Sequence, residues 1–336
     1  MNASAMDAQI PTRPLTIYGG GSWGTTLAIL LAKQGVPVSL WARDPAQAQD
    51  MSHHRLNRKY LPGILFPDLI HVVPEVDPPG CEGGEAVIAV PSHAVRDLVA
   101  RIPSAPAVWV IVSKGLEEDS CLRLSEVVAQ ASPSPIVTLA GPSLAREVAM
   151  ERPTAILSAS ENMEEARIIQ HRFVTPRFRV YCSDDPLGVE LATSLKNVVA
   201  LAAGMAAGLD LGANALGALV TRGLAEITRL GLAMGARLET FLGLAGVGDL
   251  VTTCTSSLSR NHTLGEALGR GRGLDEALGS MTMVAEGVRT AHAAVQLAAR
   301  VGVEVPIAAQ VHRILTEGLD PRAALDELMT RPLRSE

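Results

Sequence analysis

A glycine-rich turn near the start of the chain is the feature that most restricts the possible folds. The strand candidate LTIYG leads directly into Gly19-Gly20-Gly21-Ser22-Trp23-Gly24, and the helical segment TTLAILLAKQG follows. A GxGxxG between a strand and a helix is the pattern of a turn that binds a dinucleotide. Gly19 permits the tight turn, Gly21 lets the backbone approach a pyrophosphate, and Gly24 lets the helix pack closely on the strand. A glycine-rich turn without a ligand is the alternative.

The length and the order of apolar runs predict two domains. A chain of 336 residues is too long for one ordinary core. Strand and helix candidates alternate from Leu15 to about Ser183, as in a parallel sheet covered by helices, and only helices are indicated from Pro186 onward. We therefore expect a disordered lead over residues 1–13, an α/β Rossmann-type dinucleotide-binding domain over 14–184 and an all-α domain over 185–336.

These domains are assembled from individual segments. The strand candidates are LTIYG, VPVSLWA, EAVIAV, AVWVIVS, PIVTLAG, TAILSAS and FRVYCS. The helix candidates between them are 23–33, 93–101, 122–131 and 163–173. The helical runs of the second part are 186–209, 213–235, 238–243, 260–269, 274–279, 285–302 and 306–318.

Charge and hydropathy argue against nucleic acid or a membrane as the main partner. The formal net charge is −6 and the chain has no dense Lys/Arg run. The first residues, MNASAMDAQIPTRP, do not resemble a secretory signal. The apolar stretch Val198–Leu209 is interrupted by Gly204 and Gly208, so we expect a buried helix too short to span a bilayer. A cytoplasmic protein without stable membrane insertion is expected.

The cysteines do not suggest chemistry of their own. Cys81, Cys121, Cys182 and Cys254 are far apart and form no CxxC pair, so neither a metal site nor a redox dithiol is indicated. We expect reduced, mostly buried thiols.

The end of the second strand candidate bears on the choice of dinucleotide. An NAD-binding protein usually has an acid there, which holds the ribose 2′-hydroxyl, but Arg43 occupies that neighbourhood. A guanidinium can pair with a 2′-phosphate, which favours NADPH, whereas Asp44 beside it leaves NADH open. A solvated surface arginine is the other interpretation of Arg43.

Two lysines and an aspartate suggest acid/base chemistry. Lys196 lies in the helical GVELATSLKN, where apolar neighbours would desolvate its ammonium and lower its pKa, although an ordinary surface lysine fits the same pattern. Asp249 lies in LAGVGDLVTTC, which we interpret as a glycine-rich loop. A buried acid there needs a partner such as Lys196, with the Thr253 hydroxyl in the same network, unless Asp249 is a helix N-cap. Lys114 follows the strand VIVS, where open α/β sheets bind ligands.

A short polar segment offers donors for a phosphate. Ser259-Arg260-Asn261 supplies a hydroxyl, a guanidinium and an amide. The same three residues would also serve as an ordinary N-cap before the helix HTLGEALG.

Several strings, in this order, resemble the bacterial NAD(P)-dependent glycerol-3-phosphate dehydrogenase family from about residue 15 to 325. They are GGGSWGTTLA, AVPSHAVR, VSKG, AGPSLAREV, GVELATSLKNVVALAAG, TRGLAEITRLG, TFLGLAGVGDLVTTCTSSLSRN and MVAEGVRT. The resemblance implies a Rossmann-type domain followed by a helical domain like the C-terminal domain of 6-phosphogluconate dehydrogenase. It also implies interconversion of dihydroxyacetone phosphate and sn-glycerol 3-phosphate with NADPH or NADH, feeding phospholipid synthesis, and a possible homodimer.

The resemblance further implies roles for particular residues. Lys196 matches the family's proton donor or acceptor, Asp249 contacts the substrate, and Lys114 touches both substrate and cofactor. The remaining matches on the substrate side are Gly141, Ser143, Thr253, Ser259, Arg260 and Asn261. Those on the cofactor side are Gly19, Gly21, Ser22, Trp23, Gly24, Arg43, Ala145, Arg260, Val284 and Glu286.

The chain departs from the family pattern in two places, and other functions stay open. Ala192-Thr193-Ser194 stands where Gly-Gly-Ala or a similar triplet is usual, and Ala213 stands where an acid is frequent. A 3-hydroxyacid or 6-phosphogluconate-type dehydrogenase would share the turn and a catalytic lysine. A dinucleotide-binding protein that has lost catalysis is the alternative from another class.

Overall fold

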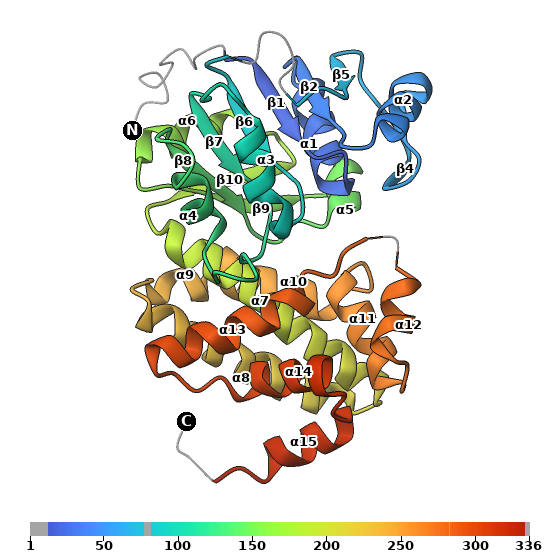
Figure 1. Ribbon diagram of the computed structural model, residues 1–336, viewed down its shortest axis with the longest axis vertical. Coiled ribbons are helices and arrows are strands. Elements are labelled where there is room, and N and C mark those ends of the chain that lie inside the picture. The colour runs from blue at the N-terminus through green and yellow to red at the C-terminus, as the bar shows by residue number, and fades with distance from the viewer. Residues whose placement is uncertain (1–12, 77–81, 282, 333–336) are drawn as a thin grey trace. The chain divides into compact units, whose positions relative to one another are not determined.

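The computed structural model describes residues 13–76, 82–281 and 283–332. The chain divides into two compact units (Figure 1). The first takes the chain as far as Ser113 together with Leu124–Pro186, and the second takes Lys114–Arg123 together with the chain from Leu187 onward. Lys114–Arg123 thus packs with the second unit, although it falls inside the range 14–184 expected for the first domain. The expected lead lies outside the described residues except for Arg13, which is fixed by an ion pair to Glu165.

The first unit is built on one twisted sheet with the strand order β10-β9-β8-β7-β6-β1-β2-β5. All seven strand candidates form strands, and β5 and a separate β3–β4 pair were not expected. The strands are β1 (Leu15–Tyr18), β2 (Val38–Trp41), β3 (Leu56–Asn57), β4 (Leu61–Leu65), β5 (Ile70–Val73), β6 (Glu85–Ile88), β7 (Val108–Ile111), β8 (Ile136–Ala140), β9 (Thr154–Ala159) and β10 (Phe178–Ser183).

The expectation of a parallel sheet is wrong for one pair, because β8 and β9 are antiparallel. Parallel neighbours need a crossover that carries the chain back along the sheet. The connection from β8 to β9 contains only the five-residue helix α5 (Ala145–Ala149), so β9 returns in the opposite direction. β1 lies between β2 and β6, and the order reverses there, which is where such sheets bind ligands.

The four helices expected in the first unit are present, with small differences at their ends. They are α1 (Ser22–Lys33), α3 (Val95–Arg101), α4 (Leu124–Ala129) and α6 (Met163–Phe173). The helices α2 (Pro45–His54) and α5 and the single turn η1 (Ser92–Ala94) were not among the candidates.

The described residues of the second unit are helical and contain no strand, as expected, apart from a single bridge within Lys114–Arg123. The predicted class of fold, α/β followed by all-α, is confirmed. The helices are α7 (Pro186–Gly208), α8 (Gly212–Ala233), α9 (Leu238–Leu242), η2 (Leu244–Gly248), α10 (Asp249–Thr255), α11 (Arg260–Gly269), α12 (Leu274–Gly279), α13 (Gly287–Val301), α14 (Pro306–Glu317) and α15 (Pro321–Met329).

The segment LAGVGDLVTTC is not a loop, which corrects the sequence interpretation. Leu244–Gly248 forms one π-helical turn that continues directly into α10, so Asp249 is the first residue of a helix. Gly246 serves packing, because a Cβ there would lie 1.8 Å from the Phe241 carbonyl oxygen.

The helix α7 runs through the core of the second unit. It is longer than the apolar stretch expected from sequence, and by length and hydropathy it qualifies as a candidate membrane span, so the prediction that it is too short is wrong. Its apolar window is, however, 89% buried inside the protein, as in a core helix. The bent pair formed by Leu238–Thr255 and Arg260–Gly269 passes the same test. Gly204 does not interrupt α7. A Cβ on Gly204 would lie 2.0 Å from the His262 carbonyl oxygen, so this glycine lets α11 pack closely against α7.

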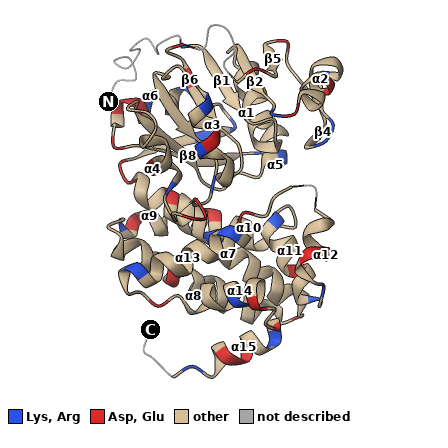
Figure 2. Cartoon of the chain, in the orientation of Figure 1, with Lys and Arg blue, Asp and Glu red and all other residues tan. Residues whose placement is uncertain are grey.

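Three of the four cysteines lie in the described part of the chain. Cys121 and Cys254 are buried and unpaired, Cys182 is partly exposed, and Cys81 lies outside the described residues. On the face drawn in Figure 2, Lys and Arg are interspersed with Asp and Glu on both units.

A buried carboxylate joins α8 to α14. Glu226 is 4% exposed and accepts the N–H groups of Ile307 (2.8 Å) and Ala308 (3.3 Å) in the first turn of α14. These donors have no partner within their own helix. Burial raises the pKa of Glu226 to about 7, against the effect of the two N–H groups.

We expect Glu226→Ala to lower the free energy of unfolding by about 2 kcal/mol, because two buried N–H groups lose their acceptor. Chemical denaturation measures this loss. Glu239→Ala, which removes an exposed carboxylate from α9, is the control and should change stability by less than about 0.5 kcal/mol. Equal stability of the two variants would contradict the role of Glu226 as a cap.

Candidate functional site

The glycine-rich turn has the geometry that its three glycines predict. Gly19 follows β1 with φ +139°, and a Cβ there would lie 2.5 Å from the Ala89 carbonyl oxygen. A Cβ on Gly24 would lie 2.0 Å from the Gly19 oxygen, so α1 packs against the turn as only a glycine allows. Gly21 has no atom within 4 Å of its Cβ position. The turn therefore leaves open space above Gly21, at the N-terminus of α1, where a phosphate fits.

Two polar side chains that sequence reasoning missed hold this turn. Asn57 is fully buried, and its Nδ2 donates to the Gly20 carbonyl (3.0 Å) and to Thr25 Oγ1 (2.8 Å). Gln47 Nε2 donates to the same carbonyl at 2.7 Å. Nothing in the local sequence distinguishes them, because they follow the turn by more than 20 residues and act through tertiary contact.

Arg43 and Asp44 differ in their hydrogen bonding and exposure. The Asp44 carboxylate accepts the N–H of Ala46 at 3.0 Å and caps α2. Arg43 lies exposed after β2. A dinucleotide ribose near the end of β2 would thus meet an uncommitted guanidinium and a carboxylate already engaged as a cap.

The other expected residues of the first unit lie at the ends of β1 and β8. Ser22 and Trp23 begin α1, and the Trp23 ring packs 6.4 Å from that of Phe178. Gly141 follows β8 with φ +147°, and its carbonyl accepts the Ser143 hydroxyl at 3.0 Å. Ala145 begins α5, and its carbonyl accepts the hydroxyl of Thr26 in α1 at 3.1 Å, which ties this segment to the helix of the glycine-rich turn.

In the second unit, two lysines share one carboxylate. Lys196 Nζ lies 2.7 Å from Asp249 Oδ1, and Lys114 Nζ lies 2.8 Å from Asp249 Oδ2. The Thr253 hydroxyl contacts Lys196 Nζ and donates to the Asp249 carbonyl. Lys196 and Asp249 are 4% and 1% exposed. The pairing of Lys196 with Asp249 and Thr253 was expected, whereas the convergence of Lys114 on the same acid was not.

Burial changes the acidity of this cluster. Desolvation and the Lys114 charge lower the pKa of Lys196 and the Asp249 carboxylate raises it, with a net fall to about 8. The fall from 10.5 corresponds to about 3 kcal/mol against the charged form. A lysine of this acidity exchanges its proton near neutral pH, as a general acid or base must.

The segment Ser259-Arg260-Asn261 combines capping with exposed donors. Ser259 accepts the His262 N–H at 3.3 Å and is the N-cap of α11, so the capping interpretation holds for this residue. Asn261 Oδ1 accepts the Gly287 N–H at 2.9 Å. Arg260 is exposed and donates to the carbonyl of Val284 at 3.1 Å. A Cβ on Gly287 would lie 2.8 Å from the carbonyl oxygen of Asn197, the neighbour of Lys196. The segment therefore lies close to the helix that carries Lys196.

The last expected cofactor residues adjoin this segment. Val284 is 40% exposed, and Glu286 is the N-cap residue of α13. Both are thus near Arg260 within the second unit.

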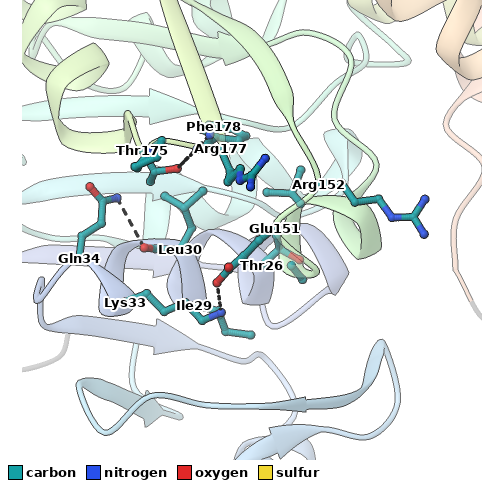
Figure 3. Close-up of a pocket in the computed structure, with 13 residues that line it drawn as sticks. Thr26, Ile29, Leu30, Lys33, Gln34, Glu151, Arg152, Thr175, Arg177 and Phe178 are labelled. Carbon is teal, nitrogen blue, oxygen red and sulfur yellow. Dashed lines mark hydrogen bonds and ion pairs between the residues drawn. The ribbon is translucent and has the colours of Figure 1, made fainter.

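A pocket on the first unit lies apart from the expected residues. It has a volume of about 290 Å³ and is lined by the second half of α1, the end of α5 and the start of β10 (Figure 3). Lys33 and Glu151 form an ion pair at its wall. None of the expected site residues lines it.

A Rossmann-type sheet with its glycine-rich turn, together with a helical unit in which a carboxylate holds a buried lysine, defines a two-part dinucleotide-dependent dehydrogenase. Residues 14–166 match the family described as NAD-dependent glycerol-3-phosphate dehydrogenase N-terminus, and residues 185–326 match the corresponding C-terminus. The chain belongs to the NAD-dependent glycerol-3-phosphate dehydrogenase family.

Full-length relatives agree with this membership. Glycerol-3-phosphate dehydrogenase [NAD(P)+] of Pelotomaculum thermopropionicum is 47% identical over 94% of this chain and 93% of its own length. That of Geobacter sulfurreducens is 46% identical over 95% and 98%. The crystal structure of glycerol-3-phosphate dehydrogenase from Coxiella burnetii superposes with a TM-score of 0.91, at 40% identity, over 96% of this chain and all of that one.

We expect Gly21→Ala to weaken dinucleotide binding at least about tenfold without destabilising the fold, because its methyl group enters space reserved for the pyrophosphate. Fluorescence titration with NADPH and thermal unfolding measure the two effects. Gly217→Ala, in α8 and equally open, is the control that should bind normally. Normal NADPH binding by Gly21→Ala would show that the pyrophosphate does not bind at this turn.

Proposed function

We propose that the chain catalyses reversible hydride transfer between NAD(P)H and dihydroxyacetone phosphate, giving sn-glycerol 3-phosphate. The observation that carries this function is the buried Lys196 held by Asp249 in a member of this dehydrogenase family. The bound nicotinamide supplies or accepts the hydride. The open turn around Gly21 fits its pyrophosphate, and the residues of the second unit do the rest.

The proton moves through Lys196. In reduction, its ammonium gives a proton to the C2 oxygen as hydride reaches C2, and in oxidation the neutral amine removes the hydroxyl proton. Asp249 and Thr253 orient Nζ for both directions. Lys114, the second cation on Asp249, stabilises negative charge that develops on the C2 oxygen.

The substrate phosphate is assigned to Arg260 and Asn261. Arg260 is exposed at the N-terminus of α11, where N–H groups and the helix dipole favour an anion. Arg260 also reaches the cofactor, as do Val284 and Glu286 beside it. Gly141 and Ser143 contribute to the substrate site, and Ala145 to the cofactor site.

The two parts of the chain have different roles. The range 14–184 binds the dinucleotide and 185–336 carries the proton chemistry, except that Lys114 comes from the earlier part of the chain. The protein acts in the cytoplasm as a homodimer, with neither nucleic acid nor a membrane as partner, and it supplies glycerol 3-phosphate for phospholipid synthesis.

The direct test follows the absorbance of NADPH and of NADH when dihydroxyacetone phosphate is added last. We expect rapid oxidation, faster with NADPH, and Arg43→Ala should remove that preference. Turnover of 3-keto acids instead of the keto phosphate would favour a 3-hydroxyacid dehydrogenase. Cofactor binding without turnover of either substrate would favour a binding protein.

We expect the pH dependence of kcat/KM to report Lys196. Reduction needs the ammonium, so its kcat/KM falls as pH rises through about 8, and kcat/KM for oxidation rises over the same range. Asp249→Asn should move this step to lower pH, because Asp249 raises the pKa of Lys196.

Lys196→Met keeps a buried apolar side chain but removes the amine that carries the proton. It should reduce kcat at least about 100-fold and leave cofactor affinity normal. Lys59→Met, at an exposed lysine, is the control. A pH step that survives in Lys196→Met would assign the titration to another group.

We expect Arg260→Ala to raise KM for dihydroxyacetone phosphate at least about tenfold, through loss of a charge-assisted hydrogen bond. Steady-state kinetics with unphosphorylated dihydroxyacetone supply an internal reference, because that substrate should not distinguish the variant from wild type. Arg270→Ala, at the far end of α11 and paired with Glu266, is the matched control. An unchanged KM for dihydroxyacetone phosphate in Arg260→Ala would show that Arg260 does not bind the phosphate.

A further inference from the structure

The segment Lys114–Arg123, here called the strap, is fastened to α7 at both ends. The Gly115 N–H donates to Ser194 Oγ at 2.9 Å, and the Arg123 guanidinium donates to Glu190 Oε2 at 2.9 Å. Ser194 and Glu190 lie one helical turn apart on the same face of α7. The strap begins three residues after the end of β7, yet it belongs to the second unit.

The rest of the strap is also ordered. Leu116 and Arg123 form a bridge, and Leu116 and Cys121 are 1% and 4% exposed. Its middle is held on α13, where Arg289 pairs with Glu118 at 3.3 Å and Arg300 donates to the Ser120 carbonyl at 3.1 Å. The strap is therefore a fixed part of the second unit.

The bond to Ser194 fixes the backbone from which Lys114 extends. Ser194 is 1% exposed, and the bond itself is buried. Gly115 has φ +137°, a backbone conformation that residues with a side chain rarely adopt. In this conformation its N–H points to Ser194 of α7. Lys114 precedes Gly115, and Lys196 follows Ser194 by two residues. This hydrogen bond directly joins the two chain segments whose lysines meet on Asp249.

Ser194 belongs to the triplet in which this chain departs from the usual family pattern. Its neighbour Thr193 donates within its own helix, to the Val189 carbonyl at 2.7 Å. An alanine at position 194 would offer Gly115 no acceptor. The Ser194 hydroxyl is therefore the group in the triplet that reaches the strap.

We propose that Ser194 is a positioning residue, which holds the strap so that the Lys114 ammonium lies beside Asp249 and the ketone oxygen of the substrate. The proposal deepens the function given above and rests on it. Ser194 does not touch the substrate; it acts through Lys114.

The test compares Ser194→Ala with Thr193→Val, which removes a buried hydroxyl that has no contact with the strap. Ser194→Ala should lower kcat/KM for dihydroxyacetone phosphate about fivefold to tenfold, mainly through KM, with unchanged NADPH affinity. The titrating Lys196 faces Asp249 and Cys254 of α10 and Lys114 of the strap. Displacing the Lys114 charge should therefore move the pH step in kcat/KM to higher pH. Thr193→Val should change neither quantity.

Hydrogen exchange gives a readout that does not depend on turnover. Amide exchange in the strap peptide should be at least about tenfold faster in Ser194→Ala than in wild type and unchanged in Thr193→Val. Glu190→Gln, which weakens the other fastening, should accelerate exchange in the same peptide. Identical kinetics and exchange in Ser194→Ala and Thr193→Val would overturn the proposal. If wild type does not reduce dihydroxyacetone phosphate but strap exchange is still faster in Ser194→Ala, the proposed function is overturned while the hydrogen bond from the strap to Ser194 stands.

Discussion

The carboxylate of Asp249 is the interaction on which the rest of the site depends. Two ammonium groups from distant parts of the chain meet on its two oxygens, and both Asp249 and Lys196 are almost fully buried. A single buried lysine without a partner would be strongly disfavoured or would lose its charge. With one acid between two lysines, Lys196 keeps a proton that it can release near neutral pH, and the cluster retains attraction for an anionic substrate.

The second unit is organised to hold this acid at a helix start inside its core. Close contacts at Gly204 and Gly287 bring α11 and α13 against α7, and Gly246 packs the π-helical turn before Asp249 on Phe241 of α9. The strap, which comes from an earlier part of the chain than these helices, adds Lys114. The glycine-rich turn lies in the first unit. The glycine-rich turn and the buried lysine thus lie on different units, which fits a reaction in which hydride and proton come from different groups.

The sequence predicts those features that depend on neighbours in the chain. The roles of Gly19, Gly21 and Gly24 follow from one short motif, and the pairing of Lys196 with Asp249 follows from the cost of burying a charge. The antiparallel β9, the helical start at Asp249 and the arrival of Lys114 on the same acid were not predicted. The last of these depends on a contact between distant residues, because Lys114 and Asp249 are 135 positions apart. The individual roles of the site residues stay predictions.

A crystal structure of the complex with NAD(P)+ and dihydroxyacetone phosphate would test the central claim most directly, because two oxidised partners cannot react. The account predicts the C2 oxygen within hydrogen-bonding distance of Lys196 Nζ, with Lys114 on the same side and the phosphate on Arg260. A substrate bound with its phosphate on the lysines and its C2 oxygen away from Lys196 would contradict it.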